Sequence, residues 1–198
     1  MKKEELIHQL KKEGFGGRIL RAFEEVDRSK FVFKEHERFA YEDEPLPIGF
    51  GQTISQPYTI AFMLNLLDLK DKQKILEVGS GSGDVLELIA HISKNSQIFG
   101  IERIKELAES SSERLKTHKN IKVVRGDGSK GLKSEKPFDR ILISASADEI
   151  PDKLINQLKF GGILVAPVKN SIMVVEKYSG QNKIKEYPGF SFVPLIED

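Results

Sequence analysis

The chain of 198 residues carries a net charge of +1 and contains no cysteine. This length fits one domain with a sizeable core, the small charge argues against nucleic acid or an anionic membrane as a partner, and the missing cysteine excludes disulfides and a thiol nucleophile. The first residues lack the apolar run of a signal peptide and no run reaches membrane-spanning length, so we expect a cytoplasmic protein without a membrane partner. We also expect a monomer.

Two short amphipathic helices are predicted near the N-terminus, over residues 3–12 and 17–26. In both segments the apolar residues recur at helical spacing, which predicts one buried face on each helix. A glycine-rich stretch joins them, and Gly14 suits the end of the first helix. The predicted inward-facing residues are Leu6, Ile7 and Leu10 in the first helix and Ile19, Leu20, Phe23 and Val26 in the second.

Residues 40–58 are predicted to form a long ordered loop, because prolines and glycines recur through the segment and exclude a helix. In an extended segment Thr53 and Ser55 point to the same face. Their hydroxyls could form a polar clamp for a ligand. Alternatively, Ser55 or its neighbour could cap the helix predicted over residues 58–67. Spacing alone leaves both interpretations open.

A glycine-rich turn follows the first strongly predicted strand. Residues 75–78 predict a buried strand, Gly79, Gly81 and Gly83 predict a tight turn, and the apolar pattern of residues 84–92 predicts the helix that follows. A strand that runs through such a turn into a helix presents backbone N–H groups to a ligand in doubly wound sheets.

The spacing of this turn argues against a dinucleotide. The G-x-G-x-x-G pattern would place its third glycine at position 84, which is Asp84. Glu77 and Asp84 bracket the turn with negative charge, which would repel the pyrophosphate that normally sits at a helix N-terminus. The same charge suits a cofactor with an ammonium and a sulfonium group, such as S-adenosylmethionine. No metal is expected, because none of the four histidines has a second His, Cys or carboxylate at a convincing metal-ligand spacing.

Further acids stand at the ends of the next two predicted strands. Glu102 lies about 20 residues after the turn and could accept both ribose hydroxyls. Asp127 and Gly128 follow the third strand, at a place suited to an adenine contact. The alternative is a glycine-rich turn with strand-end acids that serve only as caps. The predicted cofactor-binding residues are Glu77, Gly79, Ser80, Gly81, Gly83, Glu102, Asp127 and Gly128.

From residue 74 onward, predicted strands and helices alternate, which is typical of an α/β fold with a mostly parallel, doubly wound sheet. Gly161 and Gly162 are expected to end the last helix, and Asn170 and Ser171 to turn a hairpin that adds a late antiparallel strand. The predicted strands cover residues 74–79, 97–102, 121–126, 139–145, 163–168, 171–177 and 190–195, and the helices cover 84–92, 104–118 and 151–159. We expect one domain over residues 1–198, with N-terminal helices and an active-site loop in 1–60 and a Rossmann-like core in 61–198.

Several of these segments together resemble the protein-L-isoaspartate O-methyltransferase family, over about residues 21–194. The most specific is Gly51-Gln-Thr-Ile-Ser-Gln-Pro57, far upstream of the glycine turn. The resemblance also rests on Phe31-Val32, Ala40-Tyr-Glu-Asp, Pro45-Leu-Pro-Ile-Gly, Glu77-Val-Gly-Ser-Gly-Ser-Gly, Gly126-Asp-Gly, Pro137-Phe-Asp-Arg-Ile, Glu149-Ile-Pro, Gly161-Gly and Phe192-Val-Pro-Leu.

The resemblance implies a Rossmann-like, S-adenosylmethionine-dependent methyltransferase fold with a variant order of the last strands. It also implies that Ser55 is the active-site serine, with Thr53 beside it, which favours the clamp over the cap. The implied reaction is methyl transfer to the free α-carboxylate of isoaspartyl residues in proteins or peptides. The methyl ester then closes to a succinimide without the enzyme and reopens partly to normal aspartate, which is protein repair.

Two positions depart from the family pattern. Phe50 stands where many members have His between two glycines, and Ser191 stands where many have an Arg that helps to hold the substrate. These departures leave two other interpretations open. The protein could methylate a different carboxylate, or it could be a member that binds the cofactor without repair activity.

Overall fold

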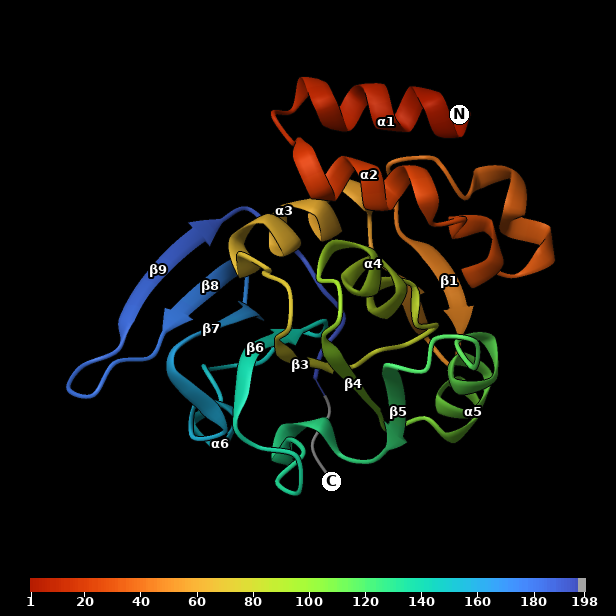
Figure 1. The fold of residues 1–198 in the computed structure, drawn as a ribbon. Coiled ribbons are helices and arrows are strands. Elements are labelled where there is room, and N and C mark those ends of the chain that lie inside the picture. The colour runs from red at the N-terminus through yellow and green to blue at the C-terminus, as the bar shows by residue number, and fades with distance from the viewer. Residues whose placement is uncertain (196–198) are drawn as a thin grey trace.

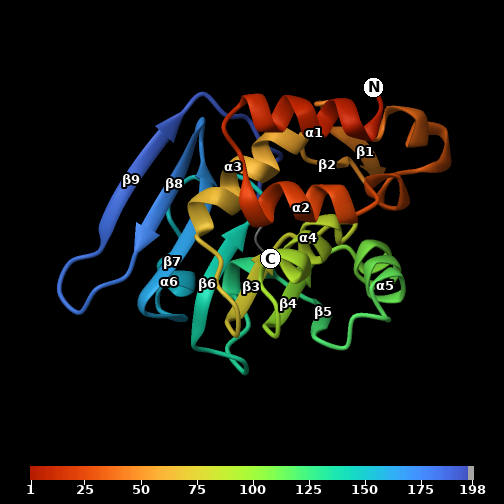
Figure 2. The same cartoon turned by 45° about the horizontal axis from the view of Figure 1, so that its top comes forward.

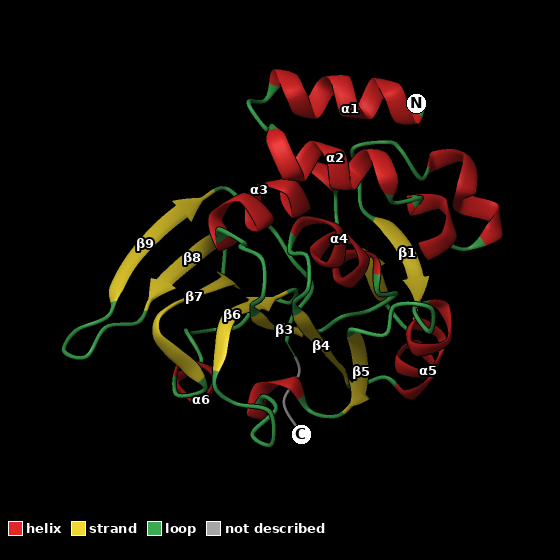
Figure 3. Ribbon diagram, in the orientation of Figure 1, coloured by secondary structure: helices red, strands yellow, loops and turns green. Residues whose placement is uncertain are grey.

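A mixed β-sheet forms the centre of the computed structural model, which describes residues 1–195. Within that range the sheet has seven strands, arranged in the order β5-β4-β3-β6-β7-β8-β9 (Figures 1 and 3). The strands are β3 (Lys74–Val78), β4 (Gln97–Glu102), β5 (Ile121–Arg125), β6 (Phe138–Ile143), β7 (Leu158–Val168), β8 (Ser171–Glu176) and β9 (Lys183–Pro188).

The strands from β5 to β7 are parallel, and β8 is antiparallel to both of its neighbours. This confirms the predicted parallel sheet with a late antiparallel strand. Lys169 and Asn170 form the hairpin turn between Val168 and Ser171, and Lys169 has a φ of 53°. The chain runs outward from β3 to β5 and then returns to the other side of β3. The crevice at such a reversal is where open α/β sheets bind ligands.

Helices gather mainly on one face of the sheet, where α1 lies on α2 and α2 lies on α4 (Figures 1 and 2). On the other face, α6 packs on β7 and contributes Leu154 to a second and smaller apolar cluster, and η3 contacts α6. The α-helices are α1 (Lys3–Lys12), α2 (Gly17–Glu25), α3 (Pro57–Leu67), α4 (Asp84–Ile92), α5 (Lys105–Arg114) and α6 (Asp152–Ile155), and the 3-10 helices are η1 (Arg28–Phe31), η2 (Lys34–Phe39) and η3 (Gly128–Lys130).

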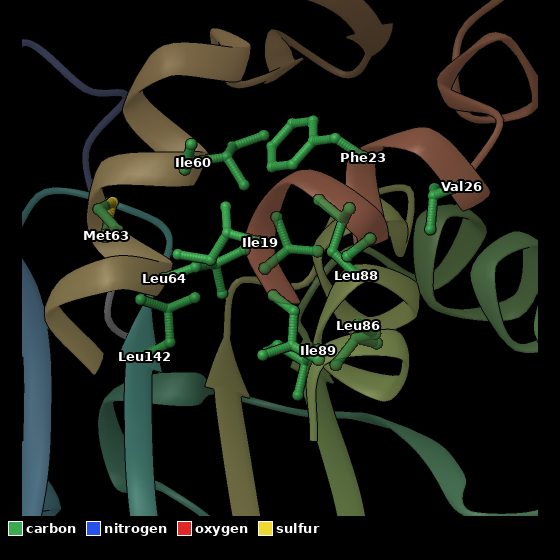
Figure 4. Packing of buried hydrophobic residues seen from close by; sticks show 14 of the residues in the cluster. Ile19, Phe23, Val26, Ile60, Met63, Leu64, Leu86, Leu88, Ile89 and Leu142 are labelled. Atoms are coloured by element: carbon green, nitrogen blue, oxygen red, sulfur yellow. The ribbon is translucent and has the colours of Figure 1, made fainter. Parts of the chain in front are cut away.

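The main core lies between the helices and the sheet. Ile19 and Phe23 of α2, Leu64 of α3, Ile89 of α4 and Leu142 of β6 belong to one cluster, in which side chains from the helices and the sheet point toward one another (Figure 4). Of the residues predicted to face inward from α1 and α2, Leu6, Leu10, Ile19, Phe23 and Val26 are buried, while Ile7 and Leu20 are half-buried. No helix among residues 1–195 is both long enough and apolar enough to cross a membrane.

The prediction for residues 151–168 was partly wrong. The helix ends at Ile155, and β7 begins at Leu158 instead of residue 163. Gly161 and Gly162 lie inside this strand, where the register with β6 shifts. Gly161 has a φ of 74°, and a Cβ on Gly162 would lie 3.0 Å from the carbonyl oxygen of Asp139. The two glycines therefore allow an irregularity in a strand, which is a common role of glycine in strands.

The predicted strand over residues 190–195 was also wrong. Among residues 1–195 the last strand is β9. After it, the N–H of Phe190 donates to the carbonyl of Asn170 in the β7–β8 turn, and Pro194 forms an isolated bridge with Ser146. Phe190 instead stacks on Phe62 of α3, with ring centroids 5.2 Å apart. Packing against α3 thus places this segment across the ends of the strands.

Residues 46–54 form a small hairpin within the segment that was predicted to be a loop. β1 (Leu46–Gly49) pairs antiparallel with β2 (Gln52–Ile54). Phe50 at the turn has a φ of 56°, and Gly49 and Gly51 beside it also have positive φ values. The prediction that this segment is not helical is confirmed, and the hairpin carries Thr53 toward the sheet.

Candidate active site

The glycine turn joins β3 to α4 at the reversal of the strand order. The N–H groups of Gly79 and Ser80 both donate to the carbonyl of Ile101, at 2.8 and 3.1 Å, which fixes the turn to β4. Gly79 and Gly81 have φ values of 78° and 49°, which favour glycine. A Cβ on Gly81 would lie 3.1 Å from the side chain of Ile48. The turn therefore has the backbone shape that was predicted for a ligand-binding loop.

Glu102 at the end of β4 is 6% exposed and reaches back to this turn. Its Oε2 accepts from the N–H of Gly81 and its Oε1 accepts from the N–H of Ile104, both at 2.9 Å. These bonds fix the position of the carboxylate. Each carboxylate oxygen can accept more than one hydrogen bond, so Glu102 keeps acceptor sites for ligand hydroxyls.

Glu77 of β3 is 1% exposed. Its Oε1 accepts a hydrogen bond of 2.7 Å from the Ser144 hydroxyl, and within residues 1–195 its Oε2 has no hydrogen-bond partner. Burial raises the pKa of Glu77 well above its ordinary value, and the charges of Asp84 and Glu102 raise it further. A cation beside Oε2 would lower this pKa and stabilise the ionised carboxylate, whereas a pyrophosphate would raise it.

Two adjoining pockets open at this end of the sheet. Glu102, Ile104 and Gly128 line the first pocket, while Glu77 and Ser55 line the second. The two pockets share five residues, which are Ile48, Thr53, Gly79, Gly81 and Ser144.

Ser55 and Thr53 come from the segment far upstream of the turn, yet both line the second pocket. Ser55 is half-buried, Thr53 is exposed and Ile54 between them is buried, as expected for alternating faces. Ser55 does not cap α3. The cap position belongs to Gln56, which makes no side-chain capping bond, and the N–H of Tyr58 donates instead to Asp43.

Two predicted cofactor residues lie outside the linings of both pockets. A Cβ on Gly83 would lie 2.8 Å from the side chain of Leu115, so this glycine allows close packing of the turn against the end of α5. Asp127 accepts from the N–H of Ser129 and pairs with Lys130. An adenine contact of Asp127 stays a prediction, while its neighbour Gly128 lines the first pocket. Ser80 lines the second.

The sequence analysis missed Arg28. This side chain is 5% exposed and pairs with Asp84, with Nη1 3.3 Å from Oδ2. Burial raises the pKa of Asp84, and the charge of Arg28 opposes that rise. The negative charge that was assigned to Asp84 is therefore compensated by Arg28. The motif Phe31-Val32 lay close by in the sequence, but nothing local marked Arg28 as buried.

The C-terminal segment forms a wall of the site, next to Ser191, where the resemblance implies a substrate contact. Val193, Pro194 and Leu195 line the first pocket, and Phe192 lines the second. The segment is held by two backbone bonds with Ser146, one of 2.7 Å to the carbonyl of Val193 and one of 2.6 Å from the N–H of Leu195. The motif Phe192-Val-Pro-Leu was the available signal.

These features fit S-adenosylmethionine. The buried Oε2 of Glu77 without a partner suits a cationic group, and the fixed carboxylate of Glu102 suits the hydroxyls of a ribose. A Cβ on Gly128 would lie 2.4 Å from the side chain of Val78, so glycine keeps the first pocket's floor close to β3. The two pockets meet at Gly79 and Gly81, so the first could hold the ribose end of such a molecule and the second its cationic end.

Comparisons with known proteins agree with this arrangement. The family model described as protein-L-isoaspartate(D-aspartate) O-methyltransferase matches residues 1–198. A protein-L-isoaspartate O-methyltransferase of Pyrococcus horikoshii is 43% identical over 200 residues, covering 96% of this chain and 90% of the relative. The protein of the same name from Ignicoccus hospitalis is 42% identical over 207 residues, covering 100% of this chain and 98% of the relative.

Solved structures match as well. A family member from Plasmodium falciparum, in complex with S-adenosyl-L-homocysteine, has a TM-score of 0.86 and 27% identity over the full length of both chains. Another protein-L-isoaspartate O-methyltransferase has a TM-score of 0.90 and 25% identity, covering 98% of this chain and 65% of that chain. The chain therefore belongs to the protein-L-isoaspartate O-methyltransferase family.

Proposed function

We propose that the protein transfers the methyl group of S-adenosylmethionine to the free α-carboxylate of L-isoaspartyl residues in damaged proteins or peptides. The observation that carries this proposal is the meeting of two distant segments. Thr53 and Ser55 line the same pocket as Glu77 and the glycine turn. The hydroxyls of Thr53 in the hairpin and of Ser55 directly after it thus lie beside the predicted cofactor residues. The curated relatives of this chain carry the name of this activity.

The reaction needs no general base. An α-carboxylate with an ordinary pKa of about 3.5 is already ionised at pH 7. When bound, S-adenosylmethionine supplies an electrophilic methyl group on a positively charged sulfur. The protein then has to align the carboxylate and exclude water, which is catalysis by positioning. This explains how a pocket without His or Cys in its lining can serve.

We assign the orientation of one carboxylate oxygen to Ser55, with Thr53 beside it. A neutral hydroxyl can donate a hydrogen bond without the strong stabilisation of the carboxylate that Lys or Arg would give. Glu102 is proposed to accept from the ribose hydroxyls, and Glu77 to face the cationic part of the cofactor. The turn between Glu77 and Glu102 is proposed to contact the cofactor through Gly79, Ser80 and Gly81.

We further propose that the protein acts as a monomer in the cytoplasm, as one domain over residues 1–198. Its partners would be isoaspartyl proteins or peptides, without nucleic acid or a membrane. The support is compositional: the chain has a net charge of +1 and no cysteine. Such a charge provides no strong field for an anionic polymer or surface.

A second candidate function rests on Phe50 and Ser191. Phe50 is 58% exposed at the tip of the hairpin, and Ser191 is exposed beside the pocket-lining Phe192. Many family members have His and Arg at these positions. The protein could therefore methylate a different carboxylate, or bind the cofactor without repair activity.

Transfer of tritiated methyl to an isoaspartyl peptide, beside its normal aspartyl twin, tests the proposal. We expect label in the isoaspartyl peptide alone. Equal labelling of both peptides, or labelling of neither while S-adenosylhomocysteine still binds in calorimetry, would overturn it. The second outcome would favour the diverged or cofactor-binding alternative.

A further inference from the structure

Arg28 joins two parts of the site that lie far apart in the sequence. Its Nη2 donates a hydrogen bond of 2.7 Å to the carbonyl oxygen of Ser55, and its Nη1 donates to Oδ2 of Asp84 at 3.3 Å. Ser55 carries the proposed catalytic hydroxyl. Asp84 is the first residue of α4, directly after the glycine turn. One planar guanidinium therefore contacts both the hydroxyl-bearing segment and the end of the cofactor turn.

Stability alone gives a weak reason for this arrangement. The side chains of Arg28 and Asp84 are 7% and 8% exposed, and burial lowers the pKa of Arg28 while it raises that of Asp84. Buried ion pairs often stabilise a fold no better than apolar residues of the same volume. The Nε of Arg28 is buried and has no hydrogen-bond partner within residues 1–195. The side-chain hydrogen bonds of Arg28 within residues 1–195 thus go to the two segments of the site.

The backbone at Ser55 needs such a contact. β2 ends at Ile54 and α3 begins at Pro57, so Ser55 belongs to neither the ladder nor the helix. A residue between two elements depends on other groups to fix its carbonyl. Arg28 reaches this carbonyl from η1, which lies before the hairpin in the chain.

We propose that Arg28 is a positioning residue, which holds the Ser55 segment at a fixed place relative to the N-terminus of α4. It acts through Ser55 and contacts neither the methyl donor nor the acceptor. This inference rests on the catalytic role proposed for Ser55. Arginine suits the task because its fork donates in two directions at once, whereas the compact ammonium of Lys cannot reproduce that geometry.

The test distinguishes a role of Arg28 in positioning Ser55 from its role as the ion-pair partner of Asp84. Arg28→Met would leave Asp84 buried without its partner, so the comparison is made in an Asp84→Asn background, in which no carboxylate is left unpaired. We expect Arg28→Met/Asp84→Asn to have a kcat about tenfold below that of Asp84→Asn, because a misplaced hydrogen-bonding group can cost this much or more. Affinity for S-adenosylhomocysteine should be similar in these two variants. The double variant should melt no lower than Asp84→Asn, in which the buried guanidinium of Arg28 has lost its charged partner.

A second measurement is independent of activity. Amide hydrogen exchange in residues 52–56 should be faster in the double variant than in Asp84→Asn, because the Ser55 carbonyl has lost its contact. Arg28→Lys in the native background keeps a charge for Asp84 but loses the fork. We expect it to fold, to bind S-adenosylhomocysteine and still to show a lowered kcat.

Arg140 provides the matched control. It is 8% exposed, and its guanidinium donates to the carbonyls of Leu67, Asp68 and Asp139, away from the pocket linings. Arg140→Met should lower the melting temperature and leave kcat and exchange in residues 52–56 unchanged at a permissive temperature.

The outcomes are distinguishable. If the native protein does not methylate the isoaspartyl peptide, the proposed function fails, and the exchange experiment still tests the contact itself. If the native protein is active and Arg28→Met changes neither kcat nor exchange in the Asp84→Asn background, Arg28 is only an ion-pair partner and the inference is overturned.

Discussion

The Ser144 hydroxyl donates a hydrogen bond of 2.7 Å to Oε1 of Glu77, and within residues 1–195 this leaves Oε2 of the same buried carboxyl without a partner. The two residues lie at the ends of adjacent parallel strands, on either side of the reversal in strand order. Because one oxygen of this buried carboxyl has no partner, we expect the stability of the protein to depend on the protonation of Glu77.

We expect Glu77→Gln to be more stable than the native protein at about pH 7 when no cofactor is added. Because burial raises the pKa of Glu77 in the folded state, the folded protein holds this proton more tightly than the unfolded chain. The free energy of unfolding should therefore fall as the pH rises from the ordinary value of 4.5 through the raised pKa.

Urea unfolding between about pH 4.5 and 8 should show a weaker pH dependence in Glu77→Gln, together with a reduced affinity for S-adenosylhomocysteine. Glu109→Gln, an exposed change on α5, should keep the native dependence. An unaltered pH dependence in Glu77→Gln would mean that this carboxyl is ionised at neutral pH despite its burial.

Glu102→Ala should weaken binding of S-adenosylmethionine and its demethylated product by about 1.5–3 kcal/mol, the range for hydrogen bonds to charged groups. The reason is the fixed carboxylate in the first pocket, which keeps acceptor sites for ribose hydroxyls. Calorimetry with Glu109→Ala as the control measures this. Native affinity in Glu102→Ala would show that the carboxylate serves only the backbone of Gly81 and Ile104. NAD should not bind the native protein.

Ser55→Ala should lower kcat roughly tenfold to a hundredfold and leave cofactor affinity nearly unchanged. Loss of one neutral hydrogen bond costs about 0.5–1.5 kcal/mol, misalignment adds to it, and about 1.4 kcal/mol corresponds to a factor of ten in rate. Thr53 lines the same pocket and can substitute in part, so the double change should be worse than either single change.

Asp43→Ala separates this effect from helix capping, because Asp43 accepts the N–H of Tyr58 at 2.8 Å at the start of α3. We expect Asp43→Ala to lose about 1 kcal/mol of stability and to keep its turnover at a permissive temperature. Melting temperature and kcat are measured on both variants. If Ser55→Ala lost stability and kept its turnover, the active-site assignment of Ser55 would be wrong.

Ser191→Arg should lower the KM for an isoaspartyl peptide. Ser191 is exposed and adjoins Phe192, which lines the pocket of Ser55 and Glu77. A guanidinium there can form a bidentate pair with a substrate carboxylate. Ser191→Gln is the neutral control of similar length and should have little effect. A KM that does not change in Ser191→Arg would show that the substrate does not pass this segment.

Gly83→Ala should destabilise the protein through packing rather than through ligand contact. Gly83 has a φ of 90°, and a Cβ there would lie 2.8 Å from Leu115 and 3.2 Å from Ser111. Strain and overpacking each cost about 1–3 kcal/mol. Gly180→Ala, with no atom within 4 Å of its added Cβ, is the control for thermal unfolding. Equal melting temperatures in the two variants would contradict this account.

Much of the cofactor half of the site could be predicted from the sequence. The strand, turn and helix around Gly79, Gly81 and Gly83 follow from local hydrophobic periodicity and from the conformational freedom of glycine. The carboxyl ends of parallel strands meet at one edge of a sheet, so the position of Glu102 followed once the strand was recognised. The family resemblance then favoured a ligand clamp over a helix cap as the role of Ser55.

Only the tertiary structure decided the contacts between distant segments. Arg28 lies 27 residues from Ser55 and 56 from Asp84 in the sequence. Nothing in the sequence around Arg28 indicates that this charged side chain is buried and bonds to both of them. The strand from Leu158 and the course of residues 190–195 likewise depend on which neighbours the topology supplies. Local propensity contributes less to strand formation than strand pairing and side-chain packing do. The sequence by itself therefore determined most elements and the chemical character of the site residues. The long-range contacts of the tertiary structure determined how the site is held together.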